Sequence, residues 1–376
     1  MDFLIDDELQ MLEESVRRLV ARDYTFSHRE QIRQSADGWS RQTWRQLADL
    51  GLLSLIVPEE WGGVGAGPIG AMLVSQVLGT GLLLEPFQAS ALVATHALIQ
   101  LADAAQRERW LPSMMSGDVT AVFADAEMGD DETRPTLRTR AVREGNGWRL
   151  DGSKHMVYHS GSADLLLVSA SVADDASGEV ALFVVGADTP GVHRQSFRTV
   201  DDQRAAFIEL TSVRVDADAR VGADANVALC ATRDFGLAMQ CADALGTLER
   251  ILAATIEYGR TRKQFGVAIG NFQALQHRMV DMYMQVEQAR SMACLAACRC
   301  AGTDAALRSA AASAAKVAIG QASRFVGQQA VQLHAGMGMS DELDVSHCFR
   351  RLTAFELRGG STDWHLRRYA KLTRLI

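Results

Sequence analysis

A short segment combines three cations, an amide and an aromatic ring in a pattern suited to ligand binding. The segment EYGRTRKQFGVAIGNFQALQ lies between two long helical patterns, and it places Arg260, Arg262 and Lys263 beside Gln264 and Phe265. A solvated charge cluster needs no phenylalanine, and a core segment needs no three cations. Guanidinium groups pair well with phosphate oxygens, while an aromatic ring offers a flat apolar contact. The mixture therefore indicates a surface for a ligand that is both anionic and flat.

A structural explanation of the same residues stays open. A capped helix turn with exposed cations would also contain Arg262, and an ordinary glycine-rich helix end would account for Gly336 and Gly338 in QLHAGMGM. The motif taken alone does not decide between a binding surface and a helix end.

Composition and charge exclude several classes of protein. The chain has 376 residues, 48% of them hydrophobic, which suits two or three packed units. Its net charge is −8 and its basic residues are dispersed, so no nucleic-acid partner is expected. No apolar run reaches about 18 residues, so no membrane span is expected. The acidic start MDFLIDDELQ is unlike a signal or transit peptide, which favours a cytoplasmic protein.

The six cysteines favour reduced, mostly buried thiols. Cys294, Cys298 and Cys300 lie in an alanine-rich helical stretch, and the other three are scattered. The sequence has neither a C-x-x-C pair nor histidines at zinc-binding spacing. No metal site is therefore expected.

The hydrophobic period divides the chain into three parts. Residues 1–117 have helical spacing, with Pro68 as a first-turn residue of one helix. Residues 118–222 have the shorter period of strands, and residues 223–376 return to very long helical patterns. Asn271 is a plausible N-cap for the helix that begins at NFQALQ.

The middle part reads as a series of strands. LRTRAVREGNGWRLDGSK predicts two strands joined across Asn146-Gly147, because Asn-Gly is a strong hairpin signal. DLLLVSASV, VALFVV and AAFIELTSVRV are further apolar runs typical of strands.

The order of these parts, together with several motifs, resembles the acyl-CoA dehydrogenase family over essentially the whole chain. The supporting motifs are VPEEWGGVGAG, WRLDGSKHMVYHSGSAD, RKQFG, FQALQHRMVDM and QLHAGMGM. The resemblance implies an α+β fold with an N-terminal helical domain, a middle β-barrel-like domain and a C-terminal four-helix bundle. It also implies FAD as the cofactor and an acyl-CoA thioester as the substrate.

The resemblance assigns the cationic segment to FAD. In this family the flavin lies between the β-domain and the C-terminal bundle, and the ADP portion reaches a neighbouring subunit. Arg262 would then meet the pyrophosphate, while Gln264 and Phe265 would supply a polar and a flat apolar contact. Gln332 and Gly336 match the second ADP-binding stretch of the family. The last helix would complete the site through two further residues, Ser361 and Asp363.

The middle part departs from the family pattern near the flavin. Many members place a Trp and a Thr after the G-x-K turn, where this chain has Met156 and Tyr158. FADAEMGDDETRP follows the TEPxxGSD strand end of the family only loosely. His155 and His159 are interpreted as polar residues at a strand end rather than as catalytic groups.

The sharpest departure concerns the catalytic base. The family reaction removes a proton from Cα while a hydride leaves Cβ for flavin N5, so a carboxylate must reach Cα. Members usually carry this Glu in a YEGT-like loop before the last helix, and the matching residue here is Gly359. Other members carry it in the helix before the Arg-x-x-Phe-Gly motif, where this chain has Gly236. The identity of the base is therefore left unassigned.

Three acids near these positions are alternatives for a displaced base, namely Glu356, Asp363 and Asp243. Each is also explained as a solvated or ion-paired carboxylate. A gap-free count along the sequence does not exclude any of them.

The absence of an acid at both base positions resembles the small subunits of two-chain bacterial acyl-CoA dehydrogenases, most closely the pimeloyl-CoA dehydrogenase small-subunit type. Related pairs act on bulky CoA esters such as steroid side chains, and one chain brings the base while both build the FAD site. The resemblance therefore implies a heterotetramer with a second acyl-CoA dehydrogenase subunit, or else a homo-oligomer. The alternatives are a self-sufficient enzyme with a displaced carboxylate and a non-catalytic scaffold. A steroid side-chain and a dicarboxylic acyl group both remain open as substrates.

Overall fold

The computed structural model describes residues 7–128, 137–172 and 178–374 and forms two compact units. Unit 1 comprises Met1–Gln31, Pro68–Leu83 and Leu237–Ile376, and unit 2 comprises Ile32–Gly67 and Leu84–Gly236. Each unit draws on more than one of the three sequence segments. The segment boundaries at residues 117 and 222 remain predictions.

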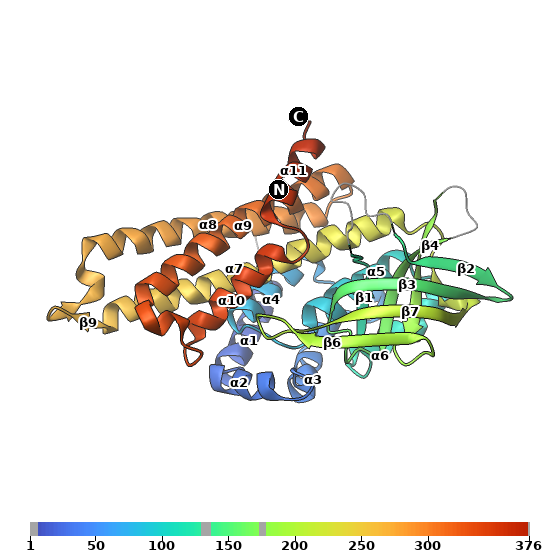
Figure 1. The fold of residues 1–376 in the computed structure, drawn as a ribbon, viewed down its shortest axis with the longest axis horizontal. Coiled ribbons are helices and arrows are strands. Elements are labelled where there is room, and N and C mark those ends of the chain that lie inside the picture. The colour runs from blue at the N-terminus through green and yellow to red at the C-terminus, as the bar shows by residue number, and fades with distance from the viewer. Residues whose placement is uncertain (1–6, 129–136, 173–177, 375–376) are drawn as a thin grey trace. The chain divides into compact units, whose positions relative to one another are not determined.

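Unit 1 is built mainly from long helices (Figure 1). Its main helices are α1 (Asp7–Asp23), α2 (Phe26–Gln34), α4 (Gly67–Thr80), α7 (Asn226–Thr261), α8 (Gln273–Cys300), α9 (Ala305–His334), α10 (Asp344–Leu357) and α11 (Thr362–Leu372). Helix α7 begins in unit 2, and its residues from Leu237 onward belong to unit 1. Helix α9 is central, because α8, α10 and α11 all pack against it. The α9 surface is rich in alanine, glycine and serine, which lets neighbouring helices approach closely.

Glycines also bring α4 and α7 into close contact. A Cβ on Gly246 would lie 1.8 Å from the carbonyl oxygen of Gln76, and a Cβ on Gly79 would lie 2.2 Å from that of Asp243. Neither position can therefore accept a side chain without moving a backbone. This contact fixes the part of α7 that leads to the cationic segment.

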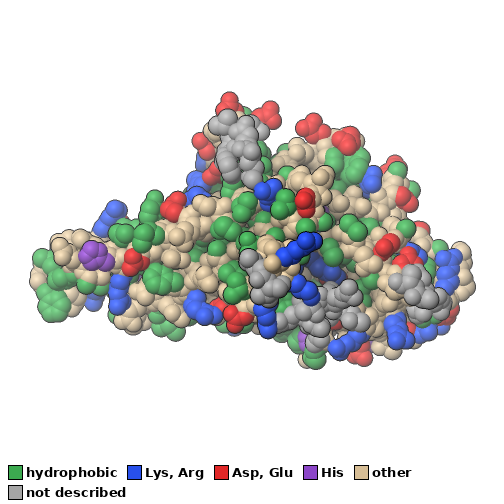
Figure 2. Space-filling model, turned by 90° about the horizontal axis from the view of Figure 1, so that it is seen from above, with side chains coloured by type: hydrophobic (Ala, Val, Ile, Leu, Met, Phe, Trp, Pro, Cys, Tyr) green, Lys and Arg blue, Asp and Glu red, His purple; other side chains and the backbone are tan. Residues whose placement is uncertain are grey.

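One face of α8 exposes apolar side chains. Val280, Tyr283 and Met284 are 54%, 53% and 49% exposed. Figure 2 shows hydrophobic side chains at the end of unit 1 that carries the start of α8, at the left of the view. Exposed apolar groups that recur along one helix face are typical of a surface that contacts another chain.

Unit 2 is a mixed β-sheet with helices. Its strands are β1 (Ala121–Ala124), β2 (Arg140–Glu144), β3 (Gly147–Tyr158), β4 (Leu165–Val172), β5 (Val180–Gly186), β6 (Val192–Arg198), β7 (Arg204–Asp216) and β8 (Arg220–Val221). Their order is β6-β7-β3-β2-β4-β5-β8, with β1 parallel to β4 at the side. The helices are α3 (Arg41–Asp49), a π-helix at Phe87–Ala94, α5 (Thr95–Leu101) and α6 (Ala104–Met115).

Most of the predicted elements are confirmed. The three apolar runs form β4, β5 and β7, and Pro68 lies in the first turn of α4. Strands β1, β6 and β8 were not anticipated. The predicted α+β class, with helical parts before and after a mixed sheet, is confirmed. No helix among the described residues is long and apolar enough to cross a membrane.

Two local predictions are wrong. The β2–β3 hairpin forms, but Glu144 pairs with Gly147, so its two turn residues are Gly145 and Asn146 rather than Asn146 and Gly147. Gly145 has φ +60°, which suits the first central position of a type II′ turn. Asn271 does not cap α8, because the N-cap is Phe272 and no side chain bonds there.

All six cysteines are free thiols, as expected, but only Cys241 and Cys348 are fully buried. Cys230 is exposed and the other three are half-buried. Burial raises the pKa of both Cys241 and Cys348 to about 12, so these two thiols are unreactive near neutral pH.

Candidate functional site

The cationic segment forms a small hairpin at the end of unit 1, between α7 and α8 (Figure 1). Strand β9 (Lys263–Gln264) pairs antiparallel with β10 (Val267–Ala268), so Phe265 and Gly266 form a two-residue turn. Both turn residues have positive φ, at +52° and +81°. Glycine adopts this region freely, whereas phenylalanine does so only under constraint.

The hairpin presents its ring and its cations to solvent. Phe265 is 92% exposed, and its ring lies edge-on to that of Phe272, with 6.2 Å between the ring centroids. Arg262 and Gln264 are exposed too, and Arg262 has no ion-pair partner among the residues described by the structure. An exposed aromatic ring held in a strained turn is costly without a ligand. This supports the binding-surface interpretation over a plain helix end.

The end of α9 packs beside the hairpin. The ring of Tyr258 on α7 stacks on that of His334, with centroids 4.3 Å apart. A small apolar cavity lies next to this pair and is lined by Gly259, Ile269 and Leu333 among others. These contacts hold the end of α7, the hairpin base and the end of α9 together.

Gln332 and Gly336 lie at this same end of unit 1 and are exposed. Gly336 belongs to a 3-10 turn, Ala335–Met339, and a Cβ placed on it would meet nothing within 4 Å. The space above its backbone is therefore open to a ligand. The structure thus brings five of the predicted residues to the same end of unit 1, all of them exposed, namely Arg262, Gln264, Phe265, Gln332 and Gly336.

Ser361 and Asp363 lie at the start of α11, which packs against α9 away from the hairpin. The start of α11 contacts Gly320, because a Cβ on Gly320 would lie 2.6 Å from Thr362 Oγ1. Gly320 precedes Gln332 by twelve residues, about 18 Å along the helix. Ser361 is also the N-cap of α11, and its Oγ accepts from the Trp364 amide at 3.2 Å. These two residues therefore form a second location in unit 1.

The surface at the hairpin fits an ADP-like group. A free guanidinium suits a pyrophosphate, an exposed ring offers a stacking face, and an exposed amide offers both a donor and an acceptor. The open backbone at Gly336 permits close approach.

The loop that would carry the base in the family is bare. Gly359 and Gly360 have φ +72° and +107°, a region that side chains rarely adopt. Lys316 is fully buried, and its Nζ donates to the carbonyl oxygens of Phe355 and Arg358, the latter at 2.8 Å. Burial lowers the pKa of Lys316 to about 8. This buried ammonium therefore fixes the end of α10 and the start of the loop.

His365 holds the other side of the loop. Its Nε2 donates to the Gly359 carbonyl at 2.8 Å, and its Nδ1 lies 3.3 Å from Ser313 Oγ. A carbonyl only accepts, so Nε2 carries a proton. Burial, helped by the cations of Lys316 and Arg368, lowers the pKa of His365 to about 3.

We expect His365 to make the fold acid-sensitive. The fold keeps the ring neutral, whereas the unfolded chain binds a proton near pH 6.5. The stabilisation is therefore complete above pH 6.5 and is lost as the pH falls toward 3. Between pH 7 and 4.5 this group should lower the free energy of unfolding by about 2–3 kcal/mol. Urea titrations of the wild type and of His365→Gln at both pH values measure the change. Equal pH dependence in the two proteins would contradict the assignment.

The three acids considered as displaced bases are not poised for proton abstraction. Glu356 is ion-paired with Arg324, whose Nε lies 3.3 Å from Glu356 Oε2. Asp243 lies 3.7 Å from Arg351. Asp363 is exposed in the first turn of α11, where a carboxylate favours the helix N-terminus. Each of these two carboxylates would have to leave its guanidinium partner to reach a substrate, which argues against Glu356 and Asp243 as the base.

The second family position for a base is equally bare. Gly236 lies within α7, and a Cβ on it would meet Val93 Cγ2 at 3.0 Å. A larger side chain there would displace this neighbour in unit 2.

A buried ionic network lies at the end of β1 in unit 2. Lys154 Nζ is fully buried and donates to Glu127 Oε1 at 2.7 Å and to Ser169 Oγ at 3.1 Å. Asp125 accepts two bonds from Arg233, at 2.5 and 2.8 Å. Burial alone would raise the pKa of both carboxyls, but Arg233 and Lys154 hold them below their usual range.

This network fixes the strand end that the resemblance places near the flavin. Glu127 also accepts from the Thr139 hydroxyl at 2.6 Å and from the amides of Arg138 and Thr139. It therefore anchors the start of β2 as well as the segment after β1. Of the motif FADAEMGDDETRP, residues 129–135 lie outside the described part of the chain.

The end of β3 is irregular where the family carries its flavin contacts. Met156 has φ +51° at a register shift between Lys154 and Val157, and it is 42% exposed. His155 packs its ring on Phe207, with centroids 4.4 Å apart. His159 is buried just after the strand and has φ +60°. The bulge turns Met156 out of the alternation of the strand.

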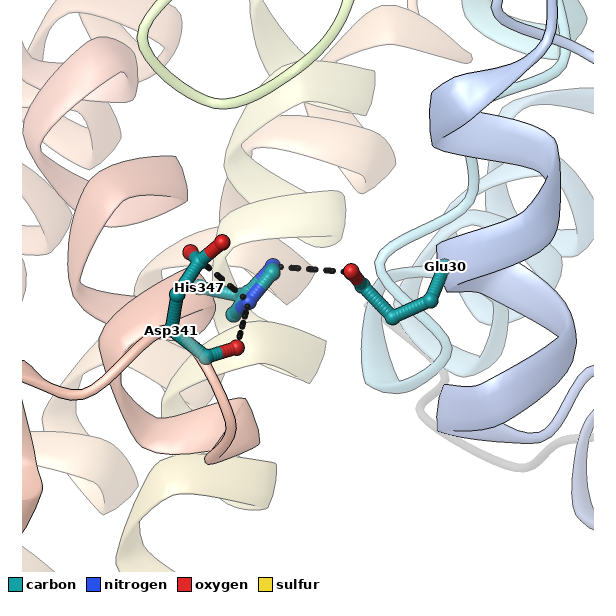
Figure 3. Close-up of side chains that lie close together, drawn as sticks. All are labelled: Glu30, Asp341 and His347. Carbon is teal, nitrogen blue, oxygen red and sulfur yellow. Dashed lines mark hydrogen bonds and ion pairs between the residues drawn. The ribbon is translucent and has the colours of Figure 1, made fainter.

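A cluster of Glu30, Asp341 and His347 in unit 1 has the composition of a metal site (Figure 3). Arg29 Nη1, however, lies 2.9 Å from His347 Nδ1, while His347 Nε2 bonds the Asp341 carbonyl at 2.9 Å. Both ring nitrogens are engaged, and burial together with nearby cations lowers the pKa of His347. A metal ion would have to displace the guanidinium, so this is a structural contact.

Several supporting residues were not identified from the sequence. Lys154 is the lysine of the G-x-K turn. Its partner Glu127 lies among the acids of FADAEMGDDETRP, so the sequence contained a signal for this ion pair. Lys316 and His365 gave no signal, because a lone Lys or His in a helical pattern is usually solvated. Their roles depend on contacts made across the fold.

The fold and this surface define a class: flavin-dependent dehydrogenases in which a β-sheet segment follows one helical segment and precedes another along the chain. Three family descriptions match in order, namely the acyl-CoA dehydrogenase N-terminal domain over residues 6–118, the middle domain over 121–213 and the C-terminal domain over 232–372. The chain therefore belongs to the acyl-CoA dehydrogenase family, whose members are FAD-dependent oxidoreductases acting on acyl-CoA.

Individual relatives agree with this placement. The acyl-CoA dehydrogenase FadE27 of Mycobacterium tuberculosis is 31% identical over 99% of this chain and 98% of its own length. The ChsE4-ChsE5 complex of the same organism contains a chain that is similar with a TM-score of 0.91, 31% identity and full coverage of both chains. A variant of the Tcur3481-Tcur3483 steroid ACAD is similar with a TM-score of 0.89 and 28% identity over 98% of both chains.

Proposed function

We propose that this chain is a FAD-binding acyl-CoA dehydrogenase subunit whose catalytic base comes from a partner subunit. The observation that carries the proposal is the bare loop at Gly359, fixed by Lys316 and His365. Gly236 is equally bare, and the nearby acids Glu356 and Asp243 are ion-paired. The similarity to a chain of the two-chain ChsE4-ChsE5 complex supports a heteromeric assembly.

The proposed division of labour gives this chain the cofactor and the positioning. Arg262, Gln264 and Phe265 would bind the ADP portion of FAD, with Gln332 and Gly336 completing that surface. The second location, at Ser361 and Asp363, would serve another part of the cofactor or another copy of it. Bound FAD supplies the acceptor for a hydride from Cβ of the thioester. The residues of this chain orient the cofactor, while a carboxylate of the partner removes the Cα proton.

A bulky acyl group such as a steroid side chain is the substrate class that we favour over a dicarboxylic one. The likeness to the Tcur3481-Tcur3483 steroid ACAD supports this choice. The pimeloyl-CoA small-subunit type, a self-sufficient enzyme and a non-catalytic scaffold are the alternatives. A cytoplasmic location remains a prediction.

We expect the chain to be part of an oligomer. The apolar face of α8 at Val280, Tyr283 and Met284 and the ring of Phe265 are too exposed for a stable monomer. Sedimentation of the purified chain, alone and after coexpression with a homologous chain that carries the base, should show a dimer or larger assembly with bound FAD. A monomer that retains FAD at full affinity would overturn the proposed assembly.

Removal of the Arg262 guanidinium should weaken FAD binding. Arg262→Ala deletes a charge-assisted contact, so about 1.5–3 kcal/mol is lost, or roughly ten- to a hundredfold in affinity. Arg262→Lys should recover only part, because an ammonium does not reproduce the planar fork. FAD titration followed by flavin absorbance measures both. Arg260→Ala is the matched control and should leave the affinity for FAD unchanged. Unchanged affinity in both Arg262 variants would show that Arg262 is an ordinary surface cation.

A further inference from the structure

Gln240 on α7 carries an amide that the fold leaves unsatisfied. Its Oε1 is buried and has no hydrogen-bond partner among the described residues. A buried amide oxygen without a donor is destabilising, because it has lost its hydrogen bonds to water and gained none in return. Such a group usually reflects a ligand, a water or a strained site.

The unsatisfied oxygen lies beside the bare loop. A Cβ on Gly359 would lie 3.4 Å from Gln240 Oε1 and 3.6 Å from Leu237 Cδ1. Because Gly359 has no side chain, the Gln240 amide faces the volume that a side chain at position 359 would occupy. Near a Cβ on Gly359 the fold therefore places one apolar group, from Leu237, and one polar group, the amide oxygen of Gln240.

The loop is held in a way that preserves this space. Lys316 and His365 bind the carbonyls of Arg358 and Gly359, so those carbonyls are already satisfied. The positive φ values of Gly359 and Gly360 keep the turn open. A group that pairs with Gln240 must therefore come from outside the fixed loop.

We propose that Gln240 is a specificity-determining residue that selects an acyl group with a hydroxyl close to its reacting carbons. A hydroxyl both donates and accepts, so it can pair with either end of the amide. A plain hydrocarbon chain would leave the amide oxygen buried and unpaired. A site built to bond a hydroxyl discriminates strongly against an analogue that lacks it. This inference rests on the proposed function, because it places the acyl group beside the loop of Gly359.

Binding of two CoA thioesters of equal chain length tests the inference. The FAD-loaded protein, in the assembly in which it purifies, is titrated anaerobically with hexanoyl-CoA and with 3-hydroxyhexanoyl-CoA by calorimetry. We expect the hydroxylated thioester to bind about tenfold more tightly, as one neutral hydrogen bond predicts. In Gln240→Met and in Gln240→Leu the two affinities should become equal. Thermal midpoints establish that the variants fold.

Gln329→Met is the matched control, because Gln329 on α9 also has a buried Oε1 without a partner among the described residues. This control should keep the preference of the wild type. Equal affinities in the wild type, or an unchanged preference in the Gln240 variants, would overturn the inference and leave the proposed function intact. Failure of both thioesters to bind the wild type would also overturn the inference, whereas the proposed function is tested separately by flavin bleaching with steroid thioesters.

Discussion

The FAD-loaded chain by itself should turn over acyl-CoA thioesters about 10²–10⁴-fold more slowly than an enzyme with a positioned base. Gly359 has no side chain and φ +72°, and Gly236 is a glycine inside a helix. Glu356 and Asp243 are ion-paired, so they are poor substitutes. Turnover with a panel of CoA thioesters, including steroid ones, and an artificial electron acceptor measures the rate at several pH values.

Addition of a homologous chain that carries the Glu should restore turnover, with one active site per heterodimer. Gly359→Glu in the isolated chain should restore only part of it. A Cβ at this position has ordinary contact distances of 3.4 and 3.6 Å, but the positive φ strains any side chain. Gly338→Glu is no useful control, because a Cβ there would collide with the Val331 carbonyl at 2.7 Å. Full activity of the isolated wild type would contradict the need for a partner.

Lys154→Met should destabilise the protein by about 3–5 kcal/mol. The substitution leaves the Glu127 carboxylate buried without its ammonium partner, 2.7 Å away in the wild type. Chemical unfolding at pH 7 measures the loss. The pKa of Glu127 is held low in the fold, so this stabilisation is present above about pH 4.5 and declines as the pH falls below it. The difference between variant and wild type should therefore shrink in acid.

Two companion variants separate the buried network from an ordinary ion pair. Arg149→Met removes a partly exposed cation that pairs with Glu144 and Asp151, and it should cost no more than about 1 kcal/mol. The double variant with Glu127→Gln should recover part of the loss, since it removes the buried carboxylate charge that Lys154 balances in the wild type. An effect of Lys154→Met as small as that of Arg149→Met would show that the network contributes little.

The fold was largely predictable because its signals are local. The long helical periods, the apolar strands and the β2–β3 hairpin depend on residues close in sequence. The turn at Gly145 was misplaced by one residue, because Gly-Asn and Asn-Gly are both turn signals and their registers differ by one. The cap of α8 was missed because Phe272 follows a 3-10 turn that takes in Asn271.

The cofactor surface was predictable in composition, while its support was not. Arg262, Gln264 and Phe265 are adjacent in the sequence, so their mixture was visible. Lys316 bonds the Arg358 carbonyl and His365 contacts Ser313, and each pair is far apart in the sequence. The hydrophobic period of the sequence carries no information about such contacts. The unsatisfied amide of Gln240 appears only once its surroundings are known.

The central claim, that this chain holds FAD but lacks the base, is tested most directly by a single turnover. Anaerobic mixing of the FAD-loaded chain with excess acyl-CoA reports proton and hydride removal as bleaching of the flavin band, independently of any electron acceptor. We expect no rapid bleaching by the chain alone and rapid bleaching after the base-carrying partner is added. Rapid bleaching by the chain alone would contradict the claim. Its loss in Glu356→Gln, Asp363→Asn or Asp243→Asn would then identify the base that this chain supplies itself.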